Sequence, residues 1–489
     1  LNERDQAIDE LASIMGITVK ESTTQNGAVT INLTSGESLV LENGAFNLFE
    51  LNTNADLTFK QLKLETNFGS QTKADASIRI VEDDLGGALG GLFGYRNEIL
   101  GPAMRDVGQL SVAFADAMNT QNKLGMDLDG QLGSNIFDIP SFRGLAYSDT
   151  NGDYVVTAQI TEGKGAELTD ADYKIEVTAV TAGVPSQIEI TLLNADGTPK
   201  KDASGNDIIY SNYAVTAGFN ELPGGIEVDF SGTDPYTVGN EFLIQPTKDI
   251  ASKITLETNR PEDLAFASPV RAGANNTNLG SANVIDVTVS NTEVGASAFD
   301  GAGGLLNSAP AQINFTAADT YDVVDGSGNV LATVTGTTDL TNLISQAGIS
   351  PDPGFDLSLD GVPKAGDSFS ISYNTDGFND NSNALNLAAI QNENTVQVSS
   401  EATNTPRTFQ DAYASMVGRI GEDASMAKVT LASAEAMKVQ SKNWFESVSG
   451  VSLDEEAANL IKYQQSYAAA ARILSTAQEL FNTILQSAR

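Results

Sequence analysis

Residues 453–489 read LDEEAANLIKYQQSYAAAARILSTAQELFNTILQSAR and contain neither glycine nor proline. Apolar side chains recur here every seven residues, in a first column of Leu453, Leu460, Tyr467, Leu474 and Phe481. A second column runs beside it and consists of Tyr463, Ala470, Ala477 and Ile484. Two such columns are typical of a helix that packs along another helix. We therefore predict a long coiled-coil arm; the alternative is a helical hairpin buried within a single domain.

The preceding segment has the same seven-residue period. From Arg407 onward, one column holds Phe409, Met416, Thr430, Met437 and Trp444, and its partner column holds Tyr413, Ile420, Ala427 and Ala434. Ser449-Gly450-Val451 is expected to end this helix. Ser452-Leu453-Asp454-Glu455 fits a capping box, which opens the next one.

The N-terminal part of the chain mixes helix with short strands. A helix is predicted from Leu1 to Gly16, and a β-hairpin follows around the turn Thr34-Ser35-Gly36-Glu37. Further strands are expected near 57–66 and 77–81. Helix returns over 85–124, where the columns Leu100, Val107, Phe114 and Ala103, Leu110, Ala117, Leu124 predict a face packed along another helix.

Between about 141 and 400 the pattern is that of β-strands separated by turn dipeptides such as Asp196-Gly197. Gln187-Ile-Glu-Ile-Thr191 is echoed by Gln312-Ile-Asn-Phe-Thr316, which suggests two related β modules. The predicted fold is thus α+β and multidomain, with helical segments near both ends and two inserted, mainly β modules. The predicted parts are a helical domain with a β-hairpin (1–140), a first β module (141–270), a second, variable β module (271–400), and a C-terminal helical return with the coiled-coil arm (401–489).

The charge is strongly acidic and unevenly distributed. The chain carries 27 Lys and Arg against 64 Asp and Glu, and residues 141–400 hold 10 basic against 34 acidic residues. Such a segment repels nucleic-acid phosphates and anionic lipid headgroups. No apolar run reaches the ~18 residues that a membrane-spanning helix needs. We expect neither nucleic acid nor a membrane among the partners.

The residue types exclude most catalytic sites. The chain has no Cys and no His, which removes disulfide frameworks, thiol nucleophiles and imidazole bases. Asp149–Asp153 opens like an EF-hand loop, but Tyr154 stands where that loop needs Gly and Ile160 where it needs Glu. Asp127–Gly130 and Asp202–Asp207 are incomplete in the same way, so a turn is preferred at each. We expect no catalysis, no cofactor and no metal.

Several stretches together resemble one family. Ser447–Glu456, Asn459–Tyr467 and Ala469–Thr476 are similar to the C-terminal signature of bacterial flagellar axial proteins. Leu1–Gln6, Gly108–Asn119, Thr408–Tyr413, Asp172–Ile175 and Gly239–Pro246 resemble the FlgK-type hook-associated proteins among them. Residues 271–400 resemble this family only weakly. The long N-terminal helical region of the family has no counterpart here, and we expect that the sequence is a fragment.

The resemblance implies a structural role in the flagellum, at the junction between hook and filament. It implies export through the flagellar type III apparatus to the extracellular flagellum. The implied partners are the hook protein, the second hook–filament junction protein, further copies of the chain in a ring, and an export chaperone on the C-terminal helix. The residues expected to make the subunit and chaperone contacts are Leu453, Leu460, Tyr463, Tyr467, Leu474, Phe481 and Ile484.

Other functions remain open at this stage. The chain could be the hook protein or another axial protein, or a secreted acidic β-rich protein that binds calcium or carbohydrate. The absence of His and Cys argues against the fourth alternative, an enzyme. On the flagellar interpretation, the arm at 453–489 is expected to be frayed or self-associated in isolation. Excision of about 275–398 is expected to leave junction assembly and swimming largely intact.

Overall fold

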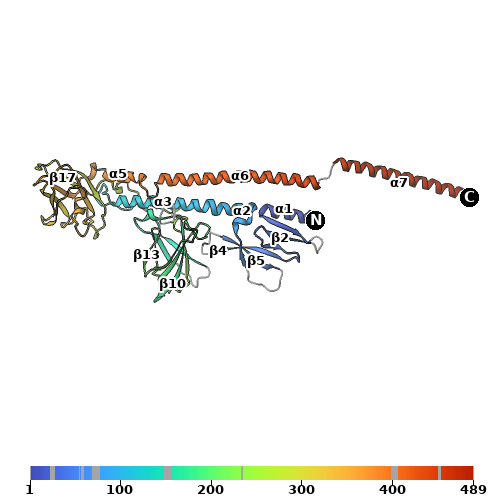
Figure 1. Cartoon of the computed structure of the whole chain (residues 1–489), viewed down its shortest axis with the longest axis horizontal. Helices are drawn as coiled ribbons and strands as arrows, with labels where there is room; N and C mark the ends of the chain where they lie inside the picture. The colour runs from blue at the N-terminus through green and yellow to red at the C-terminus, as the bar shows by residue number, and fades with distance from the viewer. Residues whose placement is uncertain are drawn as a thin grey trace. The chain divides into compact units, whose positions relative to one another are not determined.

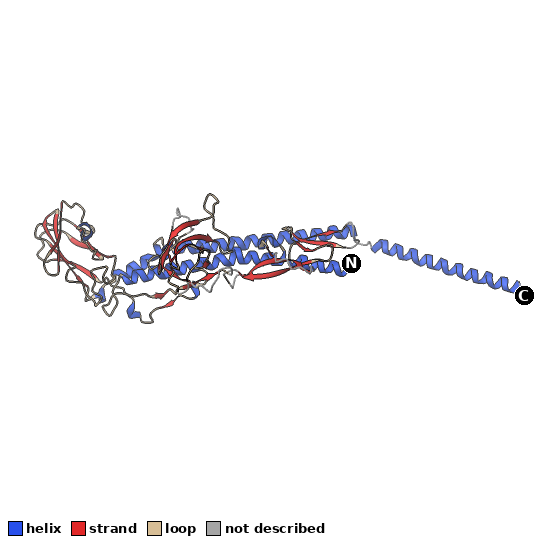
Figure 2. Cartoon of the chain, turned by 90° about the horizontal axis from the view of Figure 1, so that it is seen from below, coloured by secondary structure: helices blue, strands red, loops and turns tan. Residues whose placement is uncertain are grey.

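The computed structural model describes residues 2–22, 28–53, 56, 60–68, 77–147, 156–232, 235–397, 406–449 and 453–487. The chain divides into two compact units, Leu1–Gly418 and Arg419–Arg489. The first unit mixes helices with strands (Figure 1), whereas the described part of the second is helical (Figure 2). This mixture agrees with the predicted α+β class.

The N-terminal part is built on a six-stranded antiparallel sheet. Helix α1 (Asn2–Ile14) precedes it, and its strands follow one another in chain order: β1 (Ile17–Glu21), β2 (Val29–Leu33), β3 (Ser38–Val40), β4 (Phe46–Thr53), β5 (Lys60–Phe68) and β6 (Ser77–Arg79). The β2–β3 hairpin around residues 34–37 confirms the predicted one. The prediction of a helical domain with a hairpin was nevertheless incomplete, because that hairpin is part of a larger sheet. Its core holds Leu33, Leu62, Leu64 and Leu85.

A continuous helix leads out of this sheet, as the sequence predicted for 85–124. A short 3-10 turn (Glu82–Leu85) precedes α2 (Gly87–Gly94), and α3 (Gly101–Lys123) completes the helix. Between α2 and α3, residues Tyr95–Leu100 are wound as π-helix. Pro102 follows at the start of α3.

The predicted apolar columns of α3 are not its most buried face. Leu100, Val107 and Phe114 are each 40–43% exposed. At the end of this stripe, the Phe114 ring lies edge-on to Phe409, with centroids 5.7 Å apart. The prediction of a packed apolar seam was therefore wrong in its choice of buried face. The buried face of α3 instead combines the apolar residues Val112, Ala113 and Ala115 with five polar side chains, Arg105, Gln109, Asp116, Asn119 and Asn122.

These buried polar groups bond to the loops of the first β module. The Gln109 amide donates to the carbonyl of Leu168 (2.6 Å) and to that of Gln397 (2.8 Å). The Asp116 carboxylate accepts the backbone N–H groups of Gly163 (2.9 Å) and Gly165 (2.7 Å). Asn119 and Asn122 bond in the same way to backbone atoms at 134, 136, 137 and 265. Each of these side chains has hydrogen-bond partners, which offset part of the cost of burying a polar helix face. Burial still raises the pKa of the Asp116 carboxyl, and the two backbone bonds oppose that rise.

Arg105 makes the strongest of these contacts. Its Nε donates to Asp172 Oδ1 at 3.0 Å, its Nη2 pairs with Asp172 Oδ2, and both side chains are 4% exposed or less. Gln245 donates a further bond of 2.8 Å to Asp172 Oδ2. Burial raises the pKa of the Asp172 carboxyl, and Arg105 and Gln245 oppose that rise. The pair fixes α3 at one position along the module.

The first β module is an eight-stranded sheet in the order β12-β11-β10-β15-β8-β9-β14-β13. Tyr173, Phe230 and Phe242 are among the fully buried side chains of its core. The strands are β8 (Phe142–Ala146), β9 (Val156–Ile160), β10 (Asp172–Thr181), β11 (Val184–Leu193), β12 (Ile209–Ala214), β13 (Phe219–Leu222), β14 (Ile226–Asp229) and β15 (Glu241–Ile244).

The second β module has a separate core around Phe299, Phe315, Tyr321 and Phe369. Its five-stranded sheet has the order β17 (Val270–Ala274), β23 (Ser368–Tyr373), β19 (Pro310–Ala317), β20 (Thr320–Asp325) and β21 (Val330–Thr335). A second sheet pairs β18 (Asn283–Val289) with β22 (Phe355–Asp360). The remaining elements are the ribbon of β7 (Phe137–Asp138) and β16 (Thr255–Leu256), helices α4 (Leu343–Gln346) and α5 (Ser382–Ala389), and 3-10 turns at Gly165–Glu167, Ile250–Ser252, Pro261–Asp263, Gly377–Asn379 and Ile390–Asn392.

The internal repeat extends to the sheet topology. Five strands of the first module, in the order β12-β11-β10-β15-β8, correspond to β21-β20-β19-β23-β17 of the second, and every neighbouring pair is antiparallel in both. The echoing segments 187–191 and 312–316 lie in β11 and β19, which are not equivalent strands in this correspondence. The two modules are therefore related in strand arrangement, as predicted, but not through the echo that suggested it.

The incomplete calcium loops form turns where the structure describes them. The Asp202 carboxylate accepts the N–H groups of Ser204 and Asn206, each at 2.9 Å, and these bonds lower its pKa. Asp127 accepts the Gln131 N–H at 2.8 Å. Asp149–Asp153 lies outside the described residues. Within the described ranges, no group of three or more acidic side chains could hold a metal ion, and no helix has the length and hydropathy to cross a membrane.

The chain enters and leaves the second module through two paired strands, so the module can be excised at adjacent residues. Val270 and Tyr373 are paired across β17 and β23, and the Asn374 N–H donates to Pro269 O at 2.9 Å. We expect that replacing residues 271–372 by a short Gly/Ser turn leaves the eight-stranded module folded, because the cut ends already lie side by side. Thermal unfolding followed by circular dichroism would show the transition of the first module unchanged.

The wider excision of 275–398 is a poor choice in this structure, which corrects the boundary expected from the sequence. It removes α5, whose Asn383 amide donates to the carbonyls of Gln121 and Ala265. It also removes Gln397, an acceptor for Gln109. Loss of the first module's transition in the 271–372 deletion would show that the two modules share more than these polar contacts.

Candidate interaction surface on the C-terminal helix

Two long helices form the C-terminal part of the chain. Helix α6 (Phe409–Ser449) has 41 residues, and α7 (Leu453–Ser487) has 35, about 52 Å at about 1.5 Å per residue. Residues 450–452, which include the predicted helix break and the capping Ser452, lie outside the described residues. Asp454, Glu455 and Glu456 stand in the first turn of α7, where the helix dipole favours negative charge.

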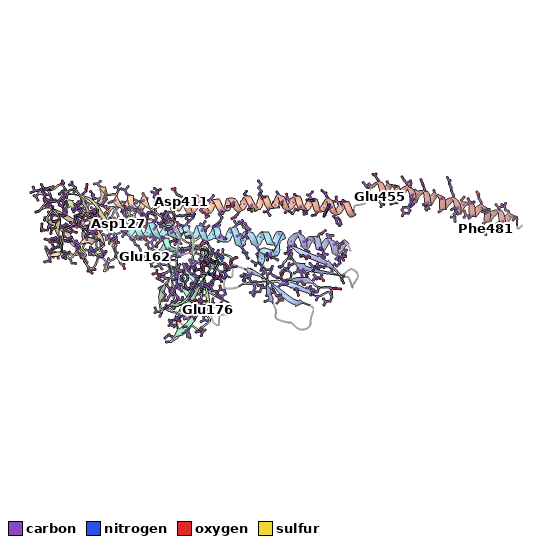
Figure 3. The ribbon with its side chains drawn as sticks, viewed as in Figure 1. Asp127, Glu162, Glu176, Asp411, Glu455 and Phe481 are labelled. Atoms are coloured by element: carbon purple, nitrogen blue, oxygen red, sulfur yellow. The ribbon has the colours of Figure 1, made fainter. Side chains whose placement is uncertain are left out.

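All seven residues predicted to make contacts lie on α7 and are exposed, by 59–86%. They are Leu453, Leu460, Tyr463, Tyr467, Leu474, Phe481 and Ile484. Every other described side chain of α7 is exposed as well. The alternative of a hairpin buried within one domain therefore does not describe this helix. Figure 3 shows Glu455 and Phe481, close to the two ends of α7, projecting from the helix.

The apolar stripe winds around α7 and widens toward its C-terminal end. A seven-residue column drifts by about 20° per repeat on a straight α-helix, so the stripe is matched by a partner that supercoils with it. Four further large apolar side chains are exposed that the two columns did not include: Ile461 in the first half of the helix, and Ile473, Leu480 and Leu485 toward its end. Leu485 follows Phe481 by one turn, and Ile473 and Leu480 flank the column of Ile484. A search for flanking positions beside the two columns would have found them.

This surface suits burial and no chemistry. It presents aliphatic and aromatic groups with the hydroxyls of Tyr463 and Tyr467, and it holds no nucleophile with a base beside it. What it can do is bury apolar area, at roughly 1.5–3 kcal/mol for each large side chain that becomes fully covered.

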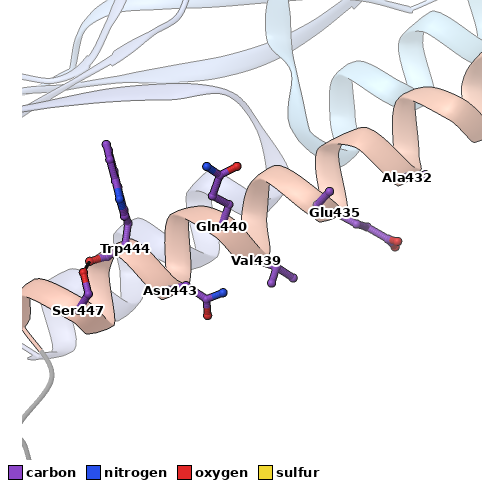
Figure 4. Close-up of a pocket in the computed structure, with 8 residues that line it drawn as sticks. Ala432, Glu435, Val439, Gln440, Asn443, Trp444 and Ser447 are labelled. Carbon is purple, nitrogen blue, oxygen red and sulfur yellow. Dashed lines mark hydrogen bonds between the residues drawn. The ribbon is translucent and has the colours of Figure 1, made fainter.

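A second surface, on α6, was not predicted as a site. It consists of exposed side chains on one stretch of α6, among them Val439, Gln440 and Trp444 (Figure 4). Trp444, the chain's single tryptophan, is 78% exposed. Its membership in a seven-residue column was the signal in the sequence.

The exposure of α7 leads to a direct prediction. A helix without tertiary contacts depends on its backbone bonds alone and opens readily. We expect amide hydrogens of residues 460–485 to exchange far faster than those of the buried strand β10, with helix content that rises with protein concentration. Slow exchange across 460–485 in dilute, monomeric protein would contradict this expectation.

The sequence is similar to known flagellar proteins. Residues 1–137 match the family model described as the flagellar hook-associated protein FlgK helical domain, and residues 445–487 match the C-terminal model of flagellar basal body rod FlgEFG proteins. The flagellar hook-associated protein 1 of Salmonella typhimurium is 27% identical over 99% of this chain, and that of Escherichia coli K12 is 25% identical over 99%. The chain is similar to the FlgK-type hook-associated proteins over nearly its whole length.

A solved FlgK-type structure agrees with this assignment. The flagellar hook junction protein FlgK from Burkholderia pseudomallei matches with a TM-score of 0.70 and 26% identity, over 92% of this chain and 78% of that one. This chain spans 64% of the length of the Salmonella relative and 63% of the Escherichia one. All seven predicted contact residues fall inside the 445–487 match to the C-terminal model of basal body rod FlgEFG proteins. The 1–137 match is what separates the FlgK type from the hook protein.

Proposed function

We propose that this chain is a structural component of the bacterial flagellum at the junction between hook and filament, and that it acts by assembly and not by catalysis. The carrying observation is the combination of two matches, the FlgK helical domain at 1–137 and the axial-protein C-terminus at 445–487. The exposed apolar stripe of α7 lies inside the second. The hook protein, the second junction protein and further copies of the chain are the partners that this role requires, in the extracellular flagellum.

The stripe is proposed to serve two contacts in succession. Before export, a chaperone covers it as a groove covers an amphipathic helix. After export, helices of neighbouring axial subunits cover it in the assembled structure. One surface can serve both because the exposed apolar side chains, Leu460 and Leu474 among them, offer a long stripe without charge in its centre.

The proposal is tested by deleting the gene in its own organism and examining the cells by electron microscopy. We expect hooks without filaments, with filament subunits released into the medium, and restoration of filaments by the full-length gene. Normal filaments in the deletion strain would reject the junction role. Hooks that are missing or overlong would favour another axial function.

A further inference from the structure

The helix that runs from Gly87 to Lys123 belongs to two bodies at once. Its first part packs into the core of the six-stranded sheet, through Leu89 and Phe93. Its last part packs into the core of the eight-stranded sheet, through Val112. These two cores have no residue in common. Along the helix, the two bodies therefore meet at the π-helical segment Tyr95–Leu100 and the start of α3.

Two arginines, nine residues apart, attach the helix to the two bodies. Arg96 donates to Lys60 O at 2.7 Å and pairs with Glu82, which holds it to the six-stranded sheet. Arg105 pairs with Asp172, which holds it to the eight-stranded sheet. The helix is thus fixed to a different partner on each side of the segment 97–104.

Between these attachments the helix departs from regular α geometry. The Gly101 N–H donates to Arg96 O, five residues back, which is the π-helical bond. Pro102 has no N–H to donate to the carbonyl of residue 98, so one bond of the α ladder is missing at this point. Prolines and π-bulges are two established causes of helix bending. Here both lie within eight residues of one another, in the stretch 95–102.

An ion pair also joins the two bodies directly. Lys248, which follows β15, pairs with Asp56, in the connection between β4 and β5. Their side chains are 15% and 8% exposed, so solvent screens the pair only partly. Neither Lys248 nor Asp56 belongs to the helix of residues 87–123. Among the ion pairs of the described residues, this one therefore joins the two bodies without involving the helix.

We propose that residues 97–102 are a hinge, about which the six-stranded sheet turns relative to the eight-stranded module, and that the Lys248–Asp56 pair holds the hinge in one position. The inference rests on the two cores, the two arginine attachments and the irregular helix between them. It does not depend on the proposed role in the flagellum.

The experiment is a distance measurement between spin labels on the full chain. The chain has no Cys, so Glu50→Cys and Gln187→Cys, at exposed positions of the two sheets, carry the only two labels. The labelled protein is diluted with unlabelled protein, and the distance distribution is recorded by double electron–electron resonance. We expect one narrow distribution for the parent, and broadening by about twofold or more when Lys248→Met releases the pair.

Two further variants decide the outcome. Pro102→Ala restores the missing N–H, so adding it to Lys248→Met is expected to narrow the distribution again. Lys201→Met, which breaks the exposed Lys201–Asp207 pair inside one module, is the matched control and should change nothing. Asp56→Asn replaces Lys248→Met if that variant fails to fold. A distribution that stays narrow without the ion pair, or broadening that Pro102→Ala does not reduce, overturns the hinge.

Discussion

Replacing Arg105 by methionine is expected to lower the free energy of unfolding of the eight-stranded module by about 3–5 kcal/mol. The substitution leaves the Asp172 carboxylate buried without its guanidinium partner, although the Gln245 amide remains bonded to it. A buried charge without a counter-charge is the costly state, because water can no longer solvate it. Chemical denaturation followed by far-ultraviolet circular dichroism measures the loss.

The double variant Arg105→Met with Asp172→Leu is the control that separates charge from packing. Removing both charges replaces the pair by apolar groups of similar size, and such exchanges are often close to neutral. We therefore expect the double variant to be more stable than the single one. A double variant as unstable as Arg105→Met would show that the shape of the pair, and not its uncompensated charge, determines the cost.

Replacing Leu460 and Leu474 by aspartate is expected to abolish filament growth. Each aspartate places a charge in the apolar stripe of α7, and covering that charge without a partner costs several kcal/mol. A tenfold loss of affinity needs only about 1.4 kcal/mol, so contacts with a chaperone or with neighbouring subunits should both fail. The assay is filament number per cell in the deletion strain that carries the variant gene.

Ala468→Asp with Ser475→Asp is the matched control for this variant. Both positions lie away from the apolar stripe of α7, with only Ala, Gln, Arg and Glu one turn away, and the change adds the same charge and the same weak helix former. Filaments are expected in this strain. The location of the Leu460/Leu474 variant protein also separates the two proposed contacts. Retention in the cell indicates failed export and hence a lost chaperone contact. Appearance in the medium indicates failed assembly and hence a lost contact with neighbouring subunits. Normal filaments with both aspartates present would place the contact surface elsewhere.

The helical parts of the chain could be predicted because their signal is local. The seven-residue spacing of Leu453, Leu460 and Tyr467 requires only that the chain be helical, and α7 has the expected extent. The six-stranded sheet was only partly predicted, because strands such as Ile17–Glu21 are short and largely exposed and carry little alternation. Strand order in the two modules depends on pairings between distant segments, which no local pattern contains.

The buried face of α3 shows why the remaining errors arose. Apolar periodicity pointed to Leu100, Val107 and Phe114, because hydrophobicity is the usual sign of burial. Arg105 and Asp116 are buried because partners in the first β module satisfy them, Asp172 for the one and backbone N–H groups for the other. The seven residues predicted to make contacts all lie exposed on α7, but the sequence does not contain the partner that would cover them.

Bonds from α3 to loop backbones also determine which substitutions the loops can accept. Asn119 bonds to the N–H groups of Ile136 and Phe137, atoms that almost any residue would supply at those positions. Side chains in these loops can therefore be substituted in evolution without loss of the hydrogen bonds that hold the helix. Gly165 and Gly133 do not tolerate substitution in this way. A Cβ at Gly165 would lie 2.6 Å from Asp116 Cβ, and a Cβ at Gly133 would lie 1.9 Å from Asn122 O. In a comparison of diverging relatives, we expect these two glycines and the polar residues of α3 to persist while the loop side chains around them change.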